Sequence, residues 1–413
     1  MSARRILHFF TAAALGVAVV SLAAQAPGAP SLLVSMVATP AGPGSAQPQL
    51  SVSANGVLLS WIERAGKVAT LKFAERTPTG WTTPRTVARG EDWFVNWADV
   101  PSVLRMSDGT LAAHWLQKSD TGTYAYDVRL SYSKDDGRTW AASFLPHSDG
   151  TKTEHGFASL VEMPNAGLGL VWLDGRATMG GHESPEGHAG GAMTVRFAAF
   201  DKKWKQTADL LIDDRVCDCC PTATAVTSEG LIAAFRNRSE TEIRDIHVAR
   251  LVNGKWTGST AVHADGWQID GCPVNGPAID ARGRNVVVSW FTTIDNQTQS
   301  LVAFSKDAGR TFSKPTRLDT RGSLGRVDVA MLPDGDALAT WIEHFDQKAE
   351  FRVRRVTPEG VSSPAATIAS ISTSRTSGYP RMALFNNALT FAWIESVNGA
   401  TSVRTATSAI PAR

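Results

Sequence analysis

The 413-residue sequence has almost no excess of charge of either sign: 41 Lys and Arg stand against 39 Asp and Glu, for a formal net charge of +2. A net charge this close to zero gives no sign of the positively charged surface that binds a nucleic acid, or of a polybasic patch that binds a membrane. Long apolar runs are also scarce, because only the N-terminus has one. We therefore expect no nucleic-acid partner, no membrane contact beyond this first segment, and a monomer.

The single long apolar run indicates an export signal. Arg4 and Arg5 precede an apolar stretch from Ile6 to Leu22, and small residues follow it. This is the order of a secretory signal peptide, here over residues 1–26. The alternative is an uncleaved anchor, because the run approaches the roughly 17 residues that can span a bilayer. The protein is expected to be periplasmic or secreted, with residues 27–48 as a linker.

One pattern recurs through residues 49–413: a turn, an apolar run, an aromatic residue and a polar residue. The aromatic residues follow one another at intervals of 51 to 63 positions and are Trp61, Trp115, Trp172, Phe235, Trp290, Trp341 and Trp393. Each repeat contains short alternating segments bounded by Gly, Asp, Asn and Pro, which is the signal for strands. Four strands in about 40–50 residues are typical of a β-propeller blade.

We therefore predict an all-β fold, a β-propeller of four-stranded blades, with seven blades favoured and six as the alternative. A solenoid fits less well, because the repeat has neither the short period of a β-helix nor a helical pattern. The last repeat stops soon after its third strand. Leu32 to Val37 could supply its missing outer strand, which would close the ring and remove free sheet edges.

Two turns between third and fourth strands share the pattern Ser-x-Asp-x-Gly-x-Thr-aromatic, known as the Asp box. Their residues are Ser133, Asp135, Gly137, Thr139 and Trp140, and Ser305, Asp307, Gly309, Thr311 and Phe312. The Asp carboxylate can accept backbone N–H groups of its own turn, while Gly tolerates positive φ. On these motifs the chain resembles the sialidase (neuraminidase) superfamily of Asp-box, or BNR-repeat, propellers. The box is a structural turn and does not by itself indicate an activity.

Propeller connectivity sorts the loops between two faces. The boxes lie on the face of the turns from strand 1 to 2 and from strand 3 to 4. The opposite face collects most of the polar groups, and we call it the cysteine face, after Cys217, Cys219, Cys220 and Cys272. Converging polar groups at one mouth predict a site for a glycan or another small molecule. The candidate ligand-binding residues on this face are Arg236, Arg238, Arg326, Arg381, Trp93 and Trp97.

The resemblance also implies an exo-sialidase-like glycoside hydrolase as an alternative function. Such an enzyme holds its acidic sugar with three arginines and uses a Tyr activated by a Glu, with an Asp as acid. The matching candidates here are Tyr379, with Glu343 or Glu395 to activate it, and Asp99 or Asp174 as the acid. The chain departs from the family in its seventh repeat and in lacking an Arg-Ile-Pro motif near the first repeat. A non-catalytic binding propeller is the other interpretation.

The four cysteines lie between positions 217 and 272. In an exported chain they could form disulfides, and four cysteines allow three pairings. They could instead bind a soft metal such as copper or zinc. The run at 217–220 does not match the paired Cys-x2-Cys spacing that we expect of a structural zinc site. A Gly-rich insertion would add copper ligands on the same face, namely Met179, His182, His188 and Met193.

Overall fold

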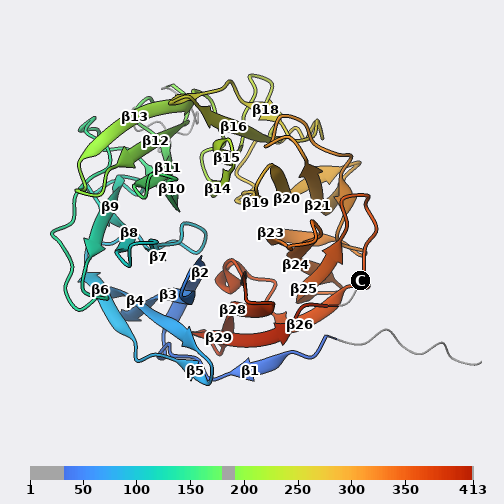
Figure 1. The fold of residues 1–413 in the computed structure, drawn as a ribbon, viewed down its shortest axis with the longest axis horizontal. Coiled ribbons are helices and arrows are strands. Elements are labelled where there is room, and N and C mark those ends of the chain that lie inside the picture. Colours follow the sequence, from blue (N-terminus) through green and yellow to red (C-terminus); the bar gives the residue numbers. More distant parts are fainter. Residues whose placement is uncertain (1–31, 179–190, 412–413) are drawn as a thin grey trace, which may run out of the picture. The chain divides into compact units, whose positions relative to one another are not determined.

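A computed structural model of the protein describes residues 32–178 and 191–411. Within these residues the chain forms seven antiparallel sheets arranged around a ring (Figure 1). The predicted all-β propeller with seven blades is confirmed. No helix in the described part is long and apolar enough to cross a membrane. The expected signal segment and the candidate ligands Met179, His182 and His188 lie outside the described residues.

The blades are numbered here along the chain. Blade 1 consists of β2 (Ser45–Ser53), β3 (Gly56–Ala65), β4 (Val68–Thr77), β5 (Gly80–Trp81) and β6 (Arg85–Gly90). Blade 2 consists of β7 (Ser102–Arg105), β8 (Leu111–Lys118) and β9 (Tyr126–Ser133). Blade 3 consists of β10 (His155–Glu162), β11 (Leu168–Asp174), β12 (Thr194–Phe200) and β13 (Gln206–Asp213). Blade 4 consists of β14 (Ala223–Thr227), β15 (Gly230–Arg236), β16 (Ile246–Val252), β17 (Lys255–Trp256) and β18 (Thr260–Ala261).

The remaining strands continue the ring. Blade 5 consists of β19 (Ala278–Arg282), β20 (Asn285–Ile294), β21 (Gln297–Ser305) and β22 (Thr316–Arg317). Blade 6 consists of β23 (Ser323–Met331), β24 (Ala337–Phe345), β25 (Lys348–Val356) and β26 (Ala366–Ile371). A 3-10 turn, η2 (Arg375–Ser377), leads into blade 7, which consists of β27 (Arg381–Phe385), β28 (Ala388–Val397), β29 (Ala400–Ala409) and β1 (Ser35–Val37).

The core lies between the blades rather than inside any one of them. The repeating aromatic residue of each second strand is buried there, and Trp61, Trp172 and Trp341 have no exposed surface. Trp61 of blade 1, for example, packs in one cluster with Ala383 and Val403 of blade 7. Burying an indole removes about 150–250 Å² from water, worth about 4–6 kcal/mol at about 25 cal/mol per Å². These layers hold the blades in register around a central channel of about 470 Å³.

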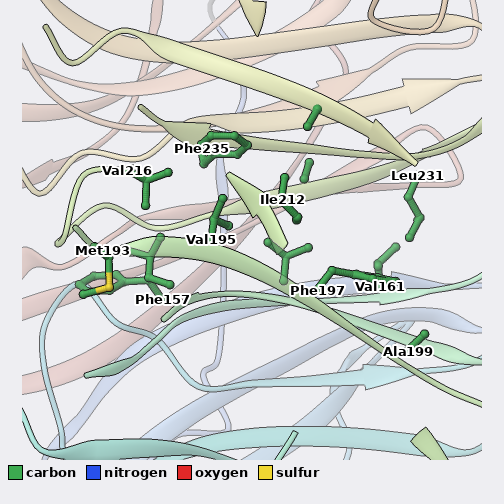
Figure 2. Packing of buried hydrophobic residues seen from close by; sticks show 14 of the residues in the cluster. Phe157, Val161, Met193, Val195, Phe197, Ala199, Ile212, Val216, Leu231 and Phe235 are labelled. Carbon is green, nitrogen blue, oxygen red and sulfur yellow. The ribbon is translucent and has the colours of Figure 1, made fainter. Parts of the chain in front are cut away.

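Met193, one of the proposed metal ligands, lies in the buried layer between blades 3 and 4. Met193 is fully buried and belongs to the same cluster as Phe157, Val216 and Phe235 (Figure 2). An unbranched thioether fills irregular gaps in such a layer well. Cys219 packs against the same cluster, and the role of Met193 as a copper ligand stays a prediction.

Blade 7 is completed by both ends of the described chain. β1 pairs with β29 in the register Ser35 to Thr407 and Val37 to Thr405. The Thr405 hydroxyl also donates a hydrogen bond to the Val37 carbonyl at 2.9 Å. β1 lies within the Leu32–Val37 segment that was expected to close the ring, and it covers the outer edge of β29.

The two Ser-x-Asp turns have the same internal bonding. In the second of them, Thr311 donates its backbone N–H and its hydroxyl to the two carboxylate oxygens of Asp307, at 2.9 and 2.6 Å. The Gly309 N–H donates to the Ser305 hydroxyl at 2.9 Å, and Gly309 has a φ of 82°. A side chain at this glycine would also meet Ile232 of the preceding blade. The motif thus ties a turn together and seats it against its neighbour.

We expect Asp307→Ala to lower the free energy of unfolding by about 1 kcal/mol, a value discounted for solvent screening. Partial burial opposes ionisation, but the bonds from Thr311 dominate and hold the pKa of Asp307 at about 2. A lowered pKa means that this contribution is present above pH 4 and is lost as the pH falls towards 2. Urea unfolding at pH 7 and pH 3 measures it. The exposed neighbour variant Lys306→Ala serves as the control, and an equal effect of both variants would contradict the prediction.

Candidate functional site

The cysteine face carries a pocket of about 290 Å³ built from aromatic and arginine side chains. Its lining residues come from the segments that precede the inner strands of blades 2, 5 and 7, and from strands β20, β21 and β23. They are Trp97, Trp267, Ile269, Pro273, Val274, Asn275, Phe291, Thr293, Thr298, Ser323, Leu324, Arg326 and Arg375. We call this the aromatic–arginine pocket. Two arginines line it, and none of its lining residues in the described chain is an Asp or a Glu.

Trp97 organises one wall of the pocket. Its indole stacks on the Tyr379 ring, with centroids 6.0 Å apart and an interplanar angle of 19°. The guanidinium carbons of Arg326 and Arg375 lie 4.7 and 5.8 Å from the indole centroid. Arg326 is held in place, because it donates to the Ser377 hydroxyl at 2.6 Å and to the Gly378 carbonyl at 3.1 Å. An aromatic platform and two cations therefore converge at this wall.

Among residues 32–178 and 191–411, no carboxylate side chain lines the pocket beside its two arginines. Burial, together with repulsion from Arg375, lowers the pKa of Arg326 from its ordinary value. Arg375 begins η2, is exposed, and makes no salt bridge with any residue in the described part of the chain. Guanidinium groups match carboxylates and sulfates with parallel hydrogen bonds. The pocket is thus suited to an anionic ligand.

The other predicted arginines have structural roles. Arg236 is 1% exposed and donates to three backbone carbonyls, those of Asn275 at 2.9 Å, Arg244 at 2.5 Å and Phe291 at 2.6 Å. Arg238 pairs with Glu242 at 2.7 Å. Both guanidinium groups are therefore bound inside the protein, and the expectation that they hold a ligand is corrected.

Trp93 and Arg381 also lie outside the pocket. Trp93 stacks on Trp115 with centroids 5.5 Å apart, where it packs in the layer between blades 1 and 2. Arg381 lines the central channel, and its guanidinium carbon lies 5.4 Å from the Tyr379 ring centroid. Of the six predicted ligand-binding residues, only Trp97 and Arg326 meet in the pocket.

Tyr379 and Glu343, the predicted catalytic pair, each form hydrogen bonds with other groups and not with each other. Tyr379 is buried and donates its hydroxyl hydrogen to the Val274 carbonyl at 2.7 Å, and burial raises the pKa of this phenol. Glu343 accepts hydrogen bonds from Thr320 at 2.7 Å and from Trp341 at 2.8 Å. A tyrosine bonded to a backbone carbonyl has no carboxylate base to activate it. The role proposed for this pair is therefore corrected.

A different tyrosine lies between two carboxyl groups. The Tyr126 hydroxyl lies 3.0 Å from Asp99 Oδ2 and 2.7 Å from Glu154 Oε1, and all three side chains are buried. Burial raises the pKa of Asp99 to about 7 and raises that of Glu154 well above its ordinary value. The Gly156 backbone packs directly on Asp99 and Tyr126, where any side chain would clash. The sequence pattern indicated Asp99 but not Tyr126, although Asp99 lies three residues before β7 and Glu154 directly precedes β10.

Asp174, the other predicted acid, belongs to a cluster of histidines and carboxylates beside blade 3. It accepts from Arg176 at 2.7 Å and from the Trp172 indole at 2.9 Å. Burial would raise its pKa, but Arg176 and His155 keep that pKa below its ordinary value. Its charge is thus already compensated, which suits a structural carboxylate better than a proton donor.

The histidines of this cluster are stacked. The rings of His147 and His155 are parallel within 7°, with centroids 3.9 Å apart, and Asp127 and Asp149 flank them. Burial opposes protonation of His155, but Asp127 and Asp149 outweigh it and raise its pKa to about 9. The ligand atoms of Asp127, His147 and His155 lie within 4.8 Å of one another, as do those of Asp149, His155 and Asp174. The group is a buried charge cluster whose donor atoms could also hold a metal ion.

The cysteines lie near the channel mouth as free thiols. Cys217 Sγ lies 3.2 Å from Cys220 Sγ and 3.8 Å from Cys219 Sγ. A disulfide needs about 2.05 Å, so the expected bridge is not formed at these distances. Cys217 and Cys220 are themselves separated by two residues, so the Cys-x2-Cys spacing is present after all. Cys272 interacts with Cys219 from the loop before blade 5.

Comparison with solved structures finds propellers of similar fold. A protein of unknown function from Dyadobacter fermentans matches with a TM-score of 0.54 and 15% identity, over 93% of this chain and 100% of its own. The polysaccharide lyase Uly1 matches with a TM-score of 0.50 and 10% identity, over 88% and 89%. The NanB sialidase from Streptococcus pneumoniae gives 0.47 and 11%, over 86% and 83%.

At these identities the likeness concerns the fold alone. The chain has a seven-bladed propeller fold that is similar to the structure of the polysaccharide lyase Uly1. No protein-family model matches the sequence, and a search of curated proteins gives no match either. The chemistry of the site must therefore be argued from its own residues.

Proposed function

We propose that the protein binds an acidic sugar unit of a glycan in the aromatic–arginine pocket. The observation that carries this proposal is the joint presence of Trp97, Trp267 and two arginines without a neutralising carboxylate. An indole face stacks on a sugar ring, while guanidinium groups recognise a carboxylate or a sulfate. The volume of about 290 Å³ is close to the lower end of ligand pockets, about 300 Å³, which suits one sugar ring. We also infer from the N-terminal segment that binding takes place outside the cytoplasm.

We expect Arg375→Ala to weaken the binding of N-acetylneuraminic acid or glucuronic acid by about 10- to 100-fold. This follows from the loss of a charge-assisted hydrogen bond worth about 1.5–3 kcal/mol. Titration calorimetry measures it, with glucose as the uncharged probe. Arg375 is exposed, so the variant should fold normally. Arg321→Ala is the matched control, because Arg321 lies on the same face, stacks on Phe345 and does not line the pocket.

Two outcomes would contradict the proposal: equal binding of glucose and the acidic sugars, or equal losses in the Arg375 and Arg321 variants. Hydrolysis is the second candidate function, favoured by the Tyr126, Asp99 and Glu154 group. A fluorogenic sialoside decides between the two. Release of the fluorophore by the wild type, abolished in Tyr126→Phe, would indicate a hydrolase. Binding without release would leave a carbohydrate-binding protein.

A further inference from the structure

We propose that Cys217, Cys219, Cys220 and Cys272 bind one thiophilic d10 metal ion, Zn²⁺ or Cu⁺. This site is separate from the aromatic–arginine pocket, and the proposal does not depend on glycan binding. Cysteine thiolates are the preferred ligands of both ions. The ligands come from two loops, since the first three precede β14 and Cys272 precedes β19.

The distances between the sulfur atoms suit a shared ion. A zinc–sulfur bond of about 2.3 Å in tetrahedral geometry places neighbouring sulfurs about 3.8 Å apart. Cys217 Sγ and Cys219 Sγ are separated by 3.8 Å, and the three sulfurs of the 217–220 run all lie within 4.8 Å of one another. The closer contact, 3.2 Å between Cys217 and Cys220, needs only a small side-chain rotation to widen. Three donors are thus already grouped around one point.

The electrostatic environment favours the thiolate form, which is the form that binds metal. Arg244 Nη1 donates to Cys217 Sγ at 3.3 Å. Cys217 is thus prepared to act as a charged ligand in an otherwise buried position.

The four cysteines differ in exposure, and this difference indicates the side from which an ion could reach the site. Cys217 and Cys220 are 0% and 1% exposed, Cys219 is half-buried, and Cys272 is exposed on the cysteine face. An ion can therefore be captured by Cys272 and Cys219 and passed inward. Cys272 Sγ is not among the sulfurs grouped within 4.8 Å of one another, so the two metals differ in whether they require it to move in. Zn²⁺ would use all four sulfurs in a closed tetrahedral site, whereas Cu⁺ is satisfied by the three sulfurs of the 217–220 run.

The test uses the full chain, reduced and kept anaerobic, with Zn²⁺ or Cu⁺ as the only additive. After desalting, we expect one bound ion per chain by mass spectrometry and protection of the thiols from a thiol reagent. Binding should also raise the thermal unfolding midpoint, because the ion binds the folded state preferentially. Co²⁺ in place of Zn²⁺ should show a thiolate-to-metal charge-transfer band.

Cys219→Ser is expected to weaken binding by at least about 100-fold, more than the loss of an outer-shell partner costs. Cys272→Ser should weaken Zn²⁺ binding and leave Cu⁺ binding within a few fold, which identifies the metal. Asp214→Asn is the matched control, because Asp214 is exposed and lies just before the cysteine run. The proposal is overturned if the reduced protein, with four reactive thiols, retains neither ion, or if Cys219→Ser and Asp214→Asn bind equally well.

Discussion

Replacing Asp99 with Asn is expected to stabilise the protein at pH 8 by about 4 kcal/mol more than it does at pH 4. Burial raises the pKa of Asp99 to about 7, whereas an unfolded chain has an Asp pKa of about 3.9. A raised pKa means that the stability contribution is complete below pH 3.9 and is lost as the pH rises through 7. The pKa of Asp99 differs by about three units between the folded and unfolded states, and each unit corresponds to about 1.36 kcal/mol, which gives the expected difference. Asn stays neutral throughout.

Urea unfolding of both proteins between pH 4 and pH 8 measures this difference. His155 also has a raised pKa, of about 9, but its carboxylate partners do not include Asp99, so its contribution cancels. The Asp99 charge also raises the pKa of Glu154, so Asp99→Asn lowers that pKa and changes the difference in the same direction. The exposed variant Asp92→Asn is the control and should stay within about 0.5 kcal/mol of wild type. A difference between wild type and Asp99→Asn that stays constant across this range would show that the Asp99 carboxyl group ionises in the folded protein as it does in water.

Arg236→Met is expected to lower the free energy of unfolding by about 3 kcal/mol or more. The substitution keeps an apolar stem beneath Trp267, whose ring centroid lies 5.0 Å from the guanidinium carbon. It also removes the donor for three buried carbonyls, those of Asn275, Arg244 and Phe291. Each buried acceptor left without a partner costs about 1–3 kcal/mol. Because these carbonyls belong to blades 4 and 5 and their linking loop, the loss loosens one joint of the ring.

Chemical unfolding compares this variant with Arg196→Met. Arg196 makes a surface ion pair with Asp209 at 2.8 Å, and such pairs are worth about 0–1 kcal/mol. If Arg236→Met does not fold, Arg236→Lys provides the measurement, because a lysine keeps the charge but cannot reach three carbonyls at once. Losses of less than 1 kcal/mol in both Arg236 variants would show that the guanidinium does not join the blades.

The architecture could be predicted because each blade repeats one local rule. The aromatic residue of the second strand fills the space between blades, so counting Trp61 and its six counterparts counts the blades. Local turn chemistry was equally informative, since the bonds around Asp307 connect residues only two to four positions apart. Even the closing strand could be inferred, from the incomplete last repeat.

The site depends on contacts between distant loops, which no local pattern encodes. Tyr379 was a reasonable catalytic candidate by type and face, but its hydroxyl partner lies 105 residues away in the Val274 carbonyl. Arg375 lies in a run of Ser, Thr and Arg without periodicity, so nothing in the sequence indicated that it lines a pocket. The partnership of Arg244 with Cys217 was missed for the same reason.

The pairing of β1 with β29 also constrains how the protein is made. Residues synthesised first bond to residues synthesised more than 360 positions later, so this contact is among the most non-local that the chain contains. Non-local pairings slow folding, because the entropy of closing the loop is lost before the contact forms. On a ribosome, the first blades can assemble in the order in which they emerge. The seventh can be completed only after β29 has been synthesised.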